Sequence, residues 1–304
     1  LNIGYASQTM FIIAKTEKNR GSIFSKTLTG AAINRYGLLF SDNISFFFWD
    51  NSERRIATDL IINKFLYLNT IVNKQINKNI FNVNNEFVGE KAIVANHDMT
   101  STYNFLIGAS ANNTGGLPPY NASYFQGDIS EILIFDTILS PENTNLLETY
   151  LRNKYSPPLS LGYDIRVPYG FCDTAISAYK PWFTSYLWST GETDSVIHVN
   201  KPGVYSCTVT DIFGFESSDD IRVFYPQVNN FADTIICYGN SVIWDAELTG
   251  DYSYEWLGSP ETTQSIEIFY EGDYALIITD SLGCKYYSDT INFSFDKYEL
   301  TASI

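Results

Sequence analysis

The sequence predicts an all-β protein with one helix, in which an N-terminal sandwich or barrel is followed by two smaller modules. Three observations support this fold class. Aromatic residues make up 16% of the chain, methionine occurs only twice, and Tyr, Phe, Ile and Thr, which favour strands, are abundant. Short apolar runs bounded by turn-forming residues succeed one another through the first third of the chain. A pattern of about 65 residues then occurs twice.

The region up to about residue 95 is expected to form short strands. Apolar runs of four to eight residues, several with alternating polar positions, occur in MFIIAK, SIFSK, YGLLFS, ISFFFWD, KFLYLNTIV and IFNVNNEFVG. This pattern is typical of an antiparallel sandwich or barrel. The polar stretch 108–123 predicts a long loop, and FQGDISEILIF at 125–135 predicts the strongest strand.

One helix is predicted directly after that strand. Ser140 suits the N-cap, Pro141 suits the first helical position, and Glu142 complements the helix dipole. The expected apolar face consists of Leu146, Leu147, Tyr150 and Leu151. We expect the helix to end near Tyr155, and the prolines of 156–161 to form a stiff linker.

Beyond the linker the chain contains an internal repeat. The phrase GVYSCTVTDIFG at 203–214 returns as GDYALIITDSLG at 272–283, which predicts two modules of similar fold. Alternation along the strand places Tyr205, Cys207 and Val209 on one face, where the second module has Tyr274, Leu276 and Ile278. Cys207 is therefore predicted to fill a core position, and a thiol buried in apolar surroundings is a poor nucleophile.

The net charge of −15 is confined to the second half of the chain. Residues 1–155 carry 13 basic and 13 acidic side chains, which leaves 6 of the 19 basic and 21 of the 34 acidic residues for the rest. The asymmetry indicates a domain boundary, and an acidic chain argues against nucleic acid as a partner. No apolar run reaches the 18 residues of a membrane span. Because the chain starts at Leu1 without a signal-like segment, we expect a piece of a larger protein.

Catalysis is not expected. Asp128 and Asp136 share a strand face but lie about 26 Å apart at roughly 3.3 Å per residue, and Glu131 points to the other face. A glycosidase needs two carboxylates within about 5 to 10 Å. A serine triad lacks its G-x-S-x-G motif, and His97 and His198 fall in different expected domains. With two histidines and no C-x-x-C pair, a zinc site is disfavoured as well.

The first 155 residues resemble the concanavalin A-like, laminin-G-like jelly-roll family. The likeness rests on FQGDISEILIFDTILSPE followed by LLETYLRNKY, and on IFNVNNEFVG, where many members carry an Asn-Gly hairpin and this chain has Asn84-Asn85. Asn tolerates positive φ, so the hairpin is kept. Strands that usually open the family domain are missing, so the resemblance implies a partly truncated jelly-roll β-sandwich.

The two repeats resemble immunoglobulin-like (Ig-like) or PKD-like modules that occur in tandem in large surface proteins of gliding, Bacteroidota-type bacteria. YLWSTGET and the phrase ending V-T-D-x-x-G-C carry the likeness, although Phe215 replaces the terminal cysteine in the first module. The Ig-like pattern of an early Cys, a Trp and a Tyr-x-Cys implies a Cys172–Cys207 disulfide, which leaves Cys237 to pair with Cys284. Each bond would stabilise by roughly 3 to 4 kcal/mol and implies an oxidising location outside the cytoplasm.

These observations predict five segments. They are a laminin-G-like jelly roll at 1–155, a linker at 156–161, Ig-like modules at 162–225 and 226–295, and the start of a following segment at 296–304. The resemblances imply an adhesin at the bacterial cell surface, in which the jelly roll recognises a glycan or protein and the modules form a stalk. One alternative is a structural spacer or a component of an envelope or secretion complex, with other envelope proteins as partners. Another is an accessory region of a carbohydrate-active enzyme.

The expected recognition residues lie mainly in the long loop of the jelly roll. Amide and aromatic side chains suited to sugars are Asn112, Asn113, Tyr120, Asn121 and Tyr124, although a solvated loop of turn formers explains the same residues. Calcium is the one cofactor that the resemblance allows. Its candidate ligands near loop ends are Asp42, Asp98 and Asp128, without support from an EF-hand spacing.

A short pattern, Asp followed by Ser or Thr and then an aliphatic residue or Ala, recurs along the chain. It resembles the O-glycosylation signal of Bacteroidota-type secreted proteins. The residues that would be modified are Thr137, Thr174, Ser195, Thr234, Ser281 and Thr290. Strands that begin directly after an Asp-ended loop would give the same pattern.

Overall fold

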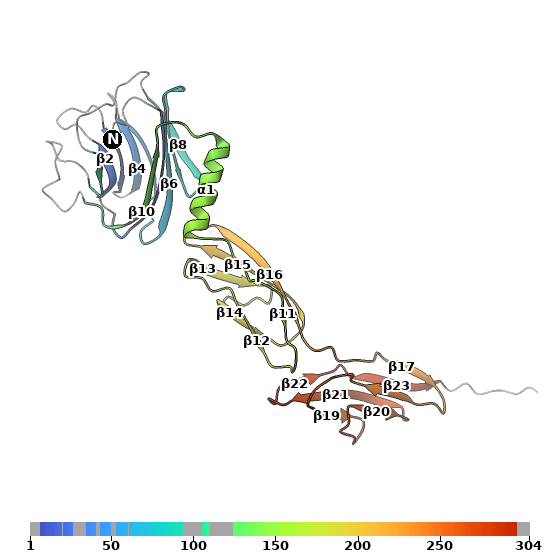
Figure 1. The fold of residues 1–304 in the computed structure, drawn as a ribbon. Coiled ribbons are helices and arrows are strands. Elements are labelled where there is room, and N and C mark those ends of the chain that lie inside the picture. Colours follow the sequence, from blue (N-terminus) through green and yellow to red (C-terminus); the bar gives the residue numbers. More distant parts are fainter. Residues whose placement is uncertain are drawn as a thin grey trace, which may run out of the picture. The chain divides into compact units, whose positions relative to one another are not determined.

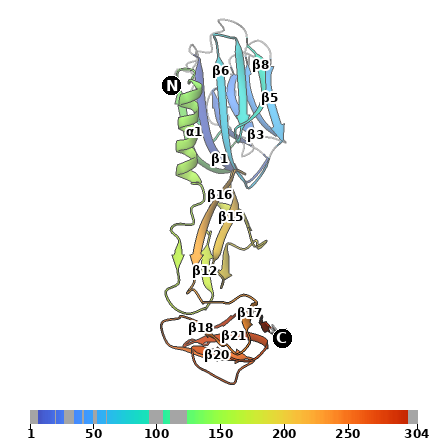
Figure 2. The same cartoon turned by 90° about the vertical axis from the view of Figure 1, so that its right-hand side faces the viewer.

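The fold is known from a computed structural model that describes residues 7–19, 21–26, 35–40, 43–49, 53–59, 61–93, 105–109 and 124–296 (Figures 1 and 2). These residues form strands and one helix, so the predicted all-β class is confirmed. The chain divides into two compact units. The first comprises Leu1–Pro158, Trp182–Thr184 and Thr210–Glu216, and the second comprises Leu159–Pro181, Ser185–Val209 and Ser217–Ile304.

The first unit contains a jelly-roll β-sandwich of two five-stranded sheets. One sheet has the order β10 (Gly127–Phe135), β1 (Gln8–Thr16), β6 (Phe65–Asn73), β7 (Lys78–Val83), β8 (Glu86–Ala92). The other has the order β5 (Glu53–Asp59), β4 (Asn43–Trp49), β3 (Arg35–Phe40), β2 (Gly21–Lys26), β9 (Leu106–Ile107). Neighbouring strands of both sheets run antiparallel, as the alternating apolar runs predict.

Strand β1 is buried on both faces. Met10, Ile12 and Ala14 point into the core between the sheets, whereas Phe11 and Ile13 point outward and are also fully buried. A strand normally alternates between core and solvent, so something must cover its outer face. That cover is the helix α1 (Pro141–Tyr155), which runs beside this sheet in both views (Figures 1 and 2).

The predicted ends of the helix are confirmed, but its apolar face is narrower than expected. Ser140 is the N-cap, and its hydroxyl accepts a hydrogen bond from the Asn143 N–H at 3.2 Å. Leu147 and Leu151 pack on the sheet, whereas Leu146 and Tyr150 are more than half exposed. The sheet covers only the i, i+4 row, which leaves the adjacent residues at the solvent side. At 15 residues, α1 is too short to cross a bilayer.

The expected hairpin at Asn84-Asn85 is confirmed. Both residues have positive φ, 50° and 65°, as a two-residue turn with right-handed twist requires. The turn is anchored to the neighbouring strand, because Asn84 Oδ1 accepts from the Tyr67 N–H at 2.9 Å.

The two repeats form similar small β-sandwiches. The first module contains β11 (Ile165–Arg166), β12 (Thr174–Ser177), β13 (Phe183–Trp188), β14 (Val196–Val199), β15 (Gly203–Asp211) and β16 (Glu216–Phe224). The second contains β17 (Thr234–Cys237), β18 (Val242–Asp245), β19 (Tyr252–Leu257), β20 (Ser265–Ile268), β21 (Gly272–Asp280), β22 (Lys285–Tyr287) and β23 (Ile291–Asp296). In each, the first strand runs parallel to the last and the second strand pairs with the fourth, β12 with β14 and β18 with β20.

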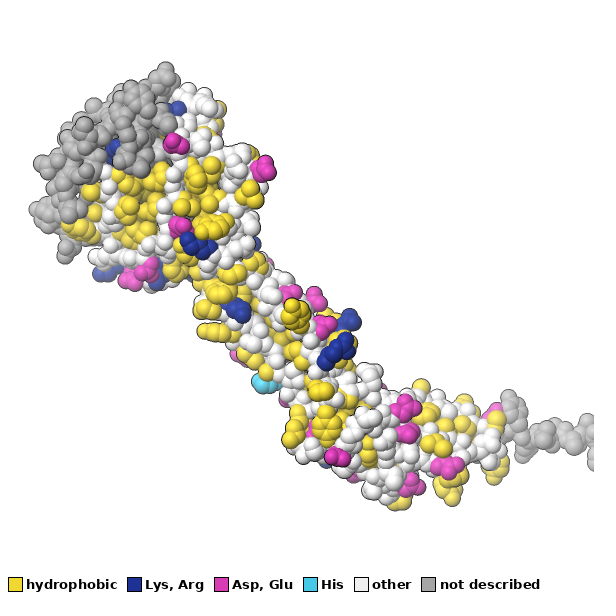
Figure 3. Space-filling view, in the orientation of Figure 1, with side chains coloured by type: hydrophobic (Ala, Val, Ile, Leu, Met, Phe, Trp, Pro, Cys, Tyr) yellow, Lys and Arg dark blue, Asp and Glu magenta, His cyan; other side chains and the backbone are white. Residues whose placement is uncertain are grey.

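The core positions of the repeat match as predicted. Cys207 is fully buried, as is Leu276 at the equivalent place. The tyrosine two residues earlier donates its hydroxyl to a carbonyl four residues upstream in both modules, Tyr205 to Lys201 at 2.9 Å and Tyr274 to Tyr270 at 3.1 Å. This is the geometry of a tyrosine corner. Acidic groups are scattered over the modules on the face seen in Figure 3.

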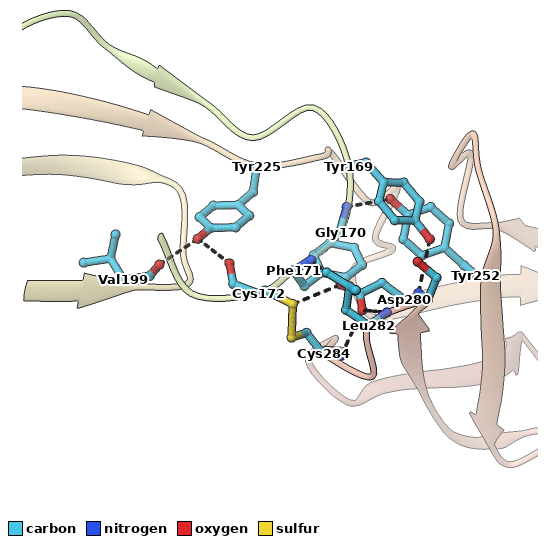
Figure 4. The surroundings of a disulfide bond; sticks show 11 residues. Tyr169, Gly170, Phe171, Cys172, Val199, Tyr225, Tyr252, Asp280, Leu282 and Cys284 are labelled. Atoms are coloured by element: carbon cyan, nitrogen blue, oxygen red, sulfur yellow. Dashed lines mark hydrogen bonds between the residues drawn. A yellow bond between two sulfur atoms is a disulfide. The ribbon is translucent and has the colours of Figure 1, made fainter. Parts of the chain in front are cut away.

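The predicted disulfide pairing is wrong. Cys172 is bonded to Cys284, with a Cα–Cα distance of 5.1 Å, whereas Cys207 is a buried free thiol and Cys237 an exposed one. Cys172 lies in the loop between β11 and β12, which contacts the second module (Figure 4). The Cys172 carbonyl also accepts from the Tyr225 hydroxyl at 3.0 Å. The bond therefore joins the two modules.

Candidate functional site

Most of the ligand residues expected from the sequence lie outside the described residues. This holds for Asn112, Asn113, Tyr120 and Asn121, and for the calcium candidates Asp42 and Asp98. Tyr124 is half-buried and forms an isolated bridge with Ala109. These residues stay a prediction.

Asp128 lies on β10, directly opposite Lys15 of β1 in the strand register. Its carboxylate forms an ion pair with the Lys15 ammonium group at 2.7 Å. In the described part of the chain, the one cluster with the donor atoms of a metal site is Cys172, Asp280 and Cys284. Both sulfurs there belong to the disulfide, so this cluster has only one carboxylate to offer.

A cavity of about 270 Å³ lies beside α1 in the first unit. We call it the α1 cleft. Its walls come from three elements: strand β6 with the β7–β8 turn, one side of α1, and the turn between β15 and β16. The lining residues are Tyr67, Asn85, Asn145, Glu148, Thr149, Arg152, Phe213 and Phe215.

The helix contributes four polar residues to the cleft because of their spacing. Asn145, Glu148, Thr149 and Arg152 recur at i, i+3, i+4 and i+7, which places them on one helix side. Leu147 and Leu151 occupy the neighbouring side and hold the helix on the sheet. The same helix is thus fixed by one row of side chains and exposes a polar row at the cleft.

Tyr67 is the most buried polar residue of the cleft. Its side chain is 5% exposed, and its ring packs on Phe11 at a centroid distance of 5.8 Å. Its hydroxyl group is buried without a hydrogen-bond partner. Burial, together with the nearby Glu148 carboxylate, raises the pKa of Tyr67 well above its ordinary value. The hydroxyl therefore keeps its proton and can donate a hydrogen bond.

Arg152 is the second group with unused hydrogen-bonding capacity. One terminal nitrogen donates to the Glu216 carbonyl at 3.2 Å, and the guanidinium lies 5.2 Å from the centre of the Phe215 ring. Its Nε–H is buried and has no partner. A buried donor without an acceptor lowers the stability of the fold by roughly 1 to 3 kcal/mol. Two such donors at one cleft therefore favour a ligand that binds them over a purely structural role.

Glu148 supplies the acceptor. Its Oε2 accepts from the Asn85 side-chain amide at 3.4 Å, and partial burial raises the pKa of its carboxyl. Glu148 is the one carboxylate among the lining residues. Since sugar hydrolysis uses two carboxylates, the cleft offers binding groups and no carboxylate pair.

The chemistry of the cleft suits a compact polyhydroxylated ligand. The Tyr67 hydroxyl and the Arg152 Nε–H can donate, Glu148 can accept, and the amides of Asn85 and Asn145 can do both. The Phe215 ring adds an apolar surface. Pockets for small ligands commonly combine such aromatic walls with a few fixed polar groups.

Two larger cavities border the same β15–β16 turn, of about 490 and 580 Å³. Phe213 lines all three, is 5% exposed, and makes an edge contact with Phe65 at 6.4 Å. Asp211 lines the cavity of about 490 Å³, and its Oδ2 is buried without a hydrogen-bond partner. The α1 cleft has two such groups, the Tyr67 hydroxyl and the Arg152 Nε. That makes the α1 cleft the better candidate for a ligand site.

Sequence reasoning missed this site. The spacing of Asn145, Glu148 and Arg152 was visible, but a polar helix row is usually solvated. The other walls come from Tyr67, far upstream, and from Phe213 and Phe215, which lie in a predicted separate module. Only the fold brings these segments together.

No family model matches the chain, and no curated protein does. Among solved structures, it is similar to the CBM40 domain of the Ruminococcus gnavus IT-sialidase, with 13% identity and a TM-score of 0.40 over 48% of this chain and 84% of that chain. It is also similar to a SAP-like pentraxin from Limulus polyphemus, with 14% identity and a TM-score of 0.39 over 51% and 75% of the two chains. A third is a putative carbohydrate binding protein from Bacteroides ovatus, with 16% identity and a TM-score of 0.34 over 45% and 39%. Similarities this weak do not show which ligand this chain binds or which activity it has.

Proposed function

We propose that this chain is a non-catalytic binding protein of the bacterial cell surface, and that the α1 cleft of the first unit holds a saccharide. The observation that carries the proposal is the Tyr67 hydroxyl, which is buried at the cleft without a partner. A bound hydroxyl group of a sugar would satisfy it, together with the Arg152 Nε–H. The aromatic and amide groups of the same cleft support this class of ligand.

The second unit fits the role of a stalk. Its two small sandwiches are joined by the Cys172–Cys284 disulfide, and such a bond persists in oxidising surroundings outside the cytoplasm. The resemblance of the repeats to modules of bacterial surface proteins supports the same location. A spacer within an envelope complex or an accessory region of a carbohydrate-active enzyme would use the same stalk.

A glycan array probed with the full chain, with and without a chelator, tests the proposal directly. Substitution Tyr67→Phe should weaken binding to the best glycan about threefold to tenfold, because it removes one hydrogen bond. It should leave the free energy of unfolding unchanged or slightly higher, because an unpaired hydroxyl is lost from the interior. Titration calorimetry and urea unfolding measure the two effects.

The matched control is Tyr155→Phe, at the last residue of α1. The Tyr155 hydroxyl is satisfied within the protein, by the Ser130 carbonyl at 3.2 Å and Glu131 Oε2 at 2.9 Å. This variant should lose roughly 1 kcal/mol of stability and no affinity. If no glycan binds with or without the chelator, or if wild type and Tyr67→Phe have equal affinities, the result would favour the spacer role.

We also propose that the Asp-Ser/Thr sites carry O-linked sugars in the native host. Thr137, Ser281 and Thr290 are exposed, and Thr174, Ser195 and Thr234 are half-buried, so the first three should be modified most fully. An intact mass above 34.4 kDa for the native chain, with added hexose-type increments, is the expected result. An unmodified mass would end this proposal.

A further inference from the structure

Two loops at equivalent places in the modules share a Tyr-Gly pair. The first, Tyr169–Asp173, connects β11 to β12, and the second, Tyr238–Ser241, connects β17 to β18. Tyr169 and Tyr238 are 69 residues apart, which is the offset of the repeated phrase at 203 and 272. The glycine after each tyrosine has a φ of 82° and 86°, so both glycines adopt the left-handed conformation.

The first loop docks on the second module, on the turn between β21 and β22 (Figure 4). The Phe171 N–H donates to Asp280 Oδ2 at 2.8 Å. The Tyr169 hydroxyl accepts from the Ser281 N–H at 3.2 Å and donates to the Asp251 carbonyl. Phe171 is 5% exposed in the core of the second module. The docked loop therefore uses two backbone N–H groups, because the Gly170 N–H also donates to the Tyr252 hydroxyl at 3.1 Å. It adds one bridging tyrosine hydroxyl and the buried Phe171 ring, in whose place the second loop has Asn240.

The receiving turn is built by the aspartate at its start. Asp280 Oδ1 accepts from the Leu282 and Cys284 N–H groups, both at 2.9 Å, which leaves Oδ2 for the docked loop. The first module has the same turn, in which Asp211 Oδ1 accepts from the Phe213 and Phe215 N–H groups at 2.9 and 3.0 Å. An Asp-x-x-Gly turn is thus the receptor for this type of loop.

The first module shows what such a turn looks like without a docked loop. Asp211 Oδ2 is buried without a partner. The Ile212 N–H bonds directly to the Trp182 carbonyl at 2.9 Å, whereas in the second module the Tyr169 hydroxyl stands between the equivalent groups of Ser281 and Asp251. This turn packs into the first unit, where Phe213 is 5% exposed, so an incoming loop cannot reach it.

The second loop is a docking element without a receptor in the described chain. Tyr238 is 78% exposed. The Asn240 N–H, two residues after the tyrosine like that of Phe171, bonds within its own turn to the Cys237 carbonyl at 3.1 Å. We propose that the loop Tyr238–Ser241 docks on the Asp-x-x-Gly turn of a further module of this kind, with the Tyr238 hydroxyl bridging that turn and the Asn240 N–H bound to its aspartate.

A second copy of this chain is not the partner that fits. One of its two turns is filled by its own first loop, and the other is buried in the first unit. The partner must therefore present a free turn with an aspartate at its start. A separate module that follows in tandem or belongs to a neighbouring protein meets this requirement.

The experiment extends the full chain by one module. A copy of residues 225–296 is fused directly after Asp296. Because the copy begins at the residue that follows β16, the new connection after β23 repeats the natural one after β16. Ser241 stands three residues after Tyr238, as Cys172 does after Tyr169. In a background with Cys237→Ser in both copies, Ser241→Cys in the middle module should form a disulfide with the copied Cys284. Peptide mapping under non-reducing conditions after equilibration in glutathione buffer measures the yield.

The controls separate docking from chance encounter. A cysteine at another exposed site of the same module, Thr262→Cys, should stay largely reduced. Adding Tyr238→Phe should lower the ratio of cross-linked to free protein about tenfold, because the bridging hydroxyl is lost. Tyr270→Phe, at a tyrosine that is 77% exposed, should leave the ratio unchanged. A yield no higher than that of Thr262→Cys, or one insensitive to Tyr238→Phe, would overturn the proposal.

Discussion

Two cysteines of this chain differ in their surroundings although neither is in a disulfide. Cys207 fills the position of Leu276 in the sister module and is fully buried, so its burial raises the pKa of the thiol. Cys237 ends an edge strand and is exposed. A thiol reacts as its thiolate, so the burial and the raised pKa of Cys207 make it a poor nucleophile, whereas Cys237 is accessible to a reagent.

A thiol titration tests this arrangement. The folded chain should react with one equivalent of a water-soluble thiol reagent, at Cys237, and the unfolded, unreduced chain with two. Mass mapping should find the first label on the peptide that contains Cys237. An unfolded, unreduced chain without any reactive thiol would contradict the Cys172–Cys284 pairing with two free thiols, since two disulfides would then be present.

At the scale of elements, the β21–β22 turn depends on one carboxylate. Asp280 is 5% exposed and receives N–H groups from its own turn and from Phe171. Burial raises the pKa of its carboxyl, but the backbone donors, with Phe171 first among them, lower it by more, so the pKa lies below its ordinary value of 3.8. The charged form is therefore the one that the fold stabilises.

Substitution Asp280→Asn should lower the free energy of unfolding of the second unit by about 2 kcal/mol, because hydrogen bonds to a charged group are lost. With a folded pKa below the unfolded one, the wild-type advantage is complete above about pH 4 and disappears as the pH falls through the folded pKa. Urea unfolding at pH 7 and pH 3 measures both. The matched control, Asp211→Asn, should cost less because Asp211 Oδ2 accepts no hydrogen bond; equal losses would refute this account.

The strands, the helix and the hairpin could be predicted from the sequence, but the disulfide and the α1 cleft could not. Alternation, the Ser140 cap and the Asn84-Asn85 turn are local signals, so the strands, the helix and the hairpin could be predicted. The disulfide could not, because the Ig-like pattern pairs cysteines within one module, whereas Cys172 lies in a loop that contacts the next module. The α1 cleft depends on Phe213 and Phe215 meeting α1, which no local signal encodes.

For the whole molecule, the main covalent constraint is the bond between modules. It closes a stretch with a sequence separation of 112 residues, for which loop entropy gives about 4.7 kcal/mol and measured cases about 2 to 4 kcal/mol. The two modules should therefore unfold together when the bond is intact.

The double substitution Cys172→Ser with Cys284→Ser should lower the stability of the second unit by about 2 to 4 kcal/mol. It should also separate the unfolding of the two modules, which tryptophan fluorescence can follow through Trp188 in the first module and through Trp244 and Trp256 in the second. Cys237→Ser, at an exposed thiol, should change neither. A single unchanged transition in the double variant would show that packing alone couples the modules.

The same bond determines how the chain would respond to tension. Load on the polypeptide would pass from residue 172 to residue 284 through the sulfur bridge and bypass everything between them. At about 3.5 Å per residue, roughly 390 Å of contour length is thereby withheld from stretching. In a surface-anchored chain under flow, residues 173–283 would stay out of the load path until a reductant, and not force, released that length.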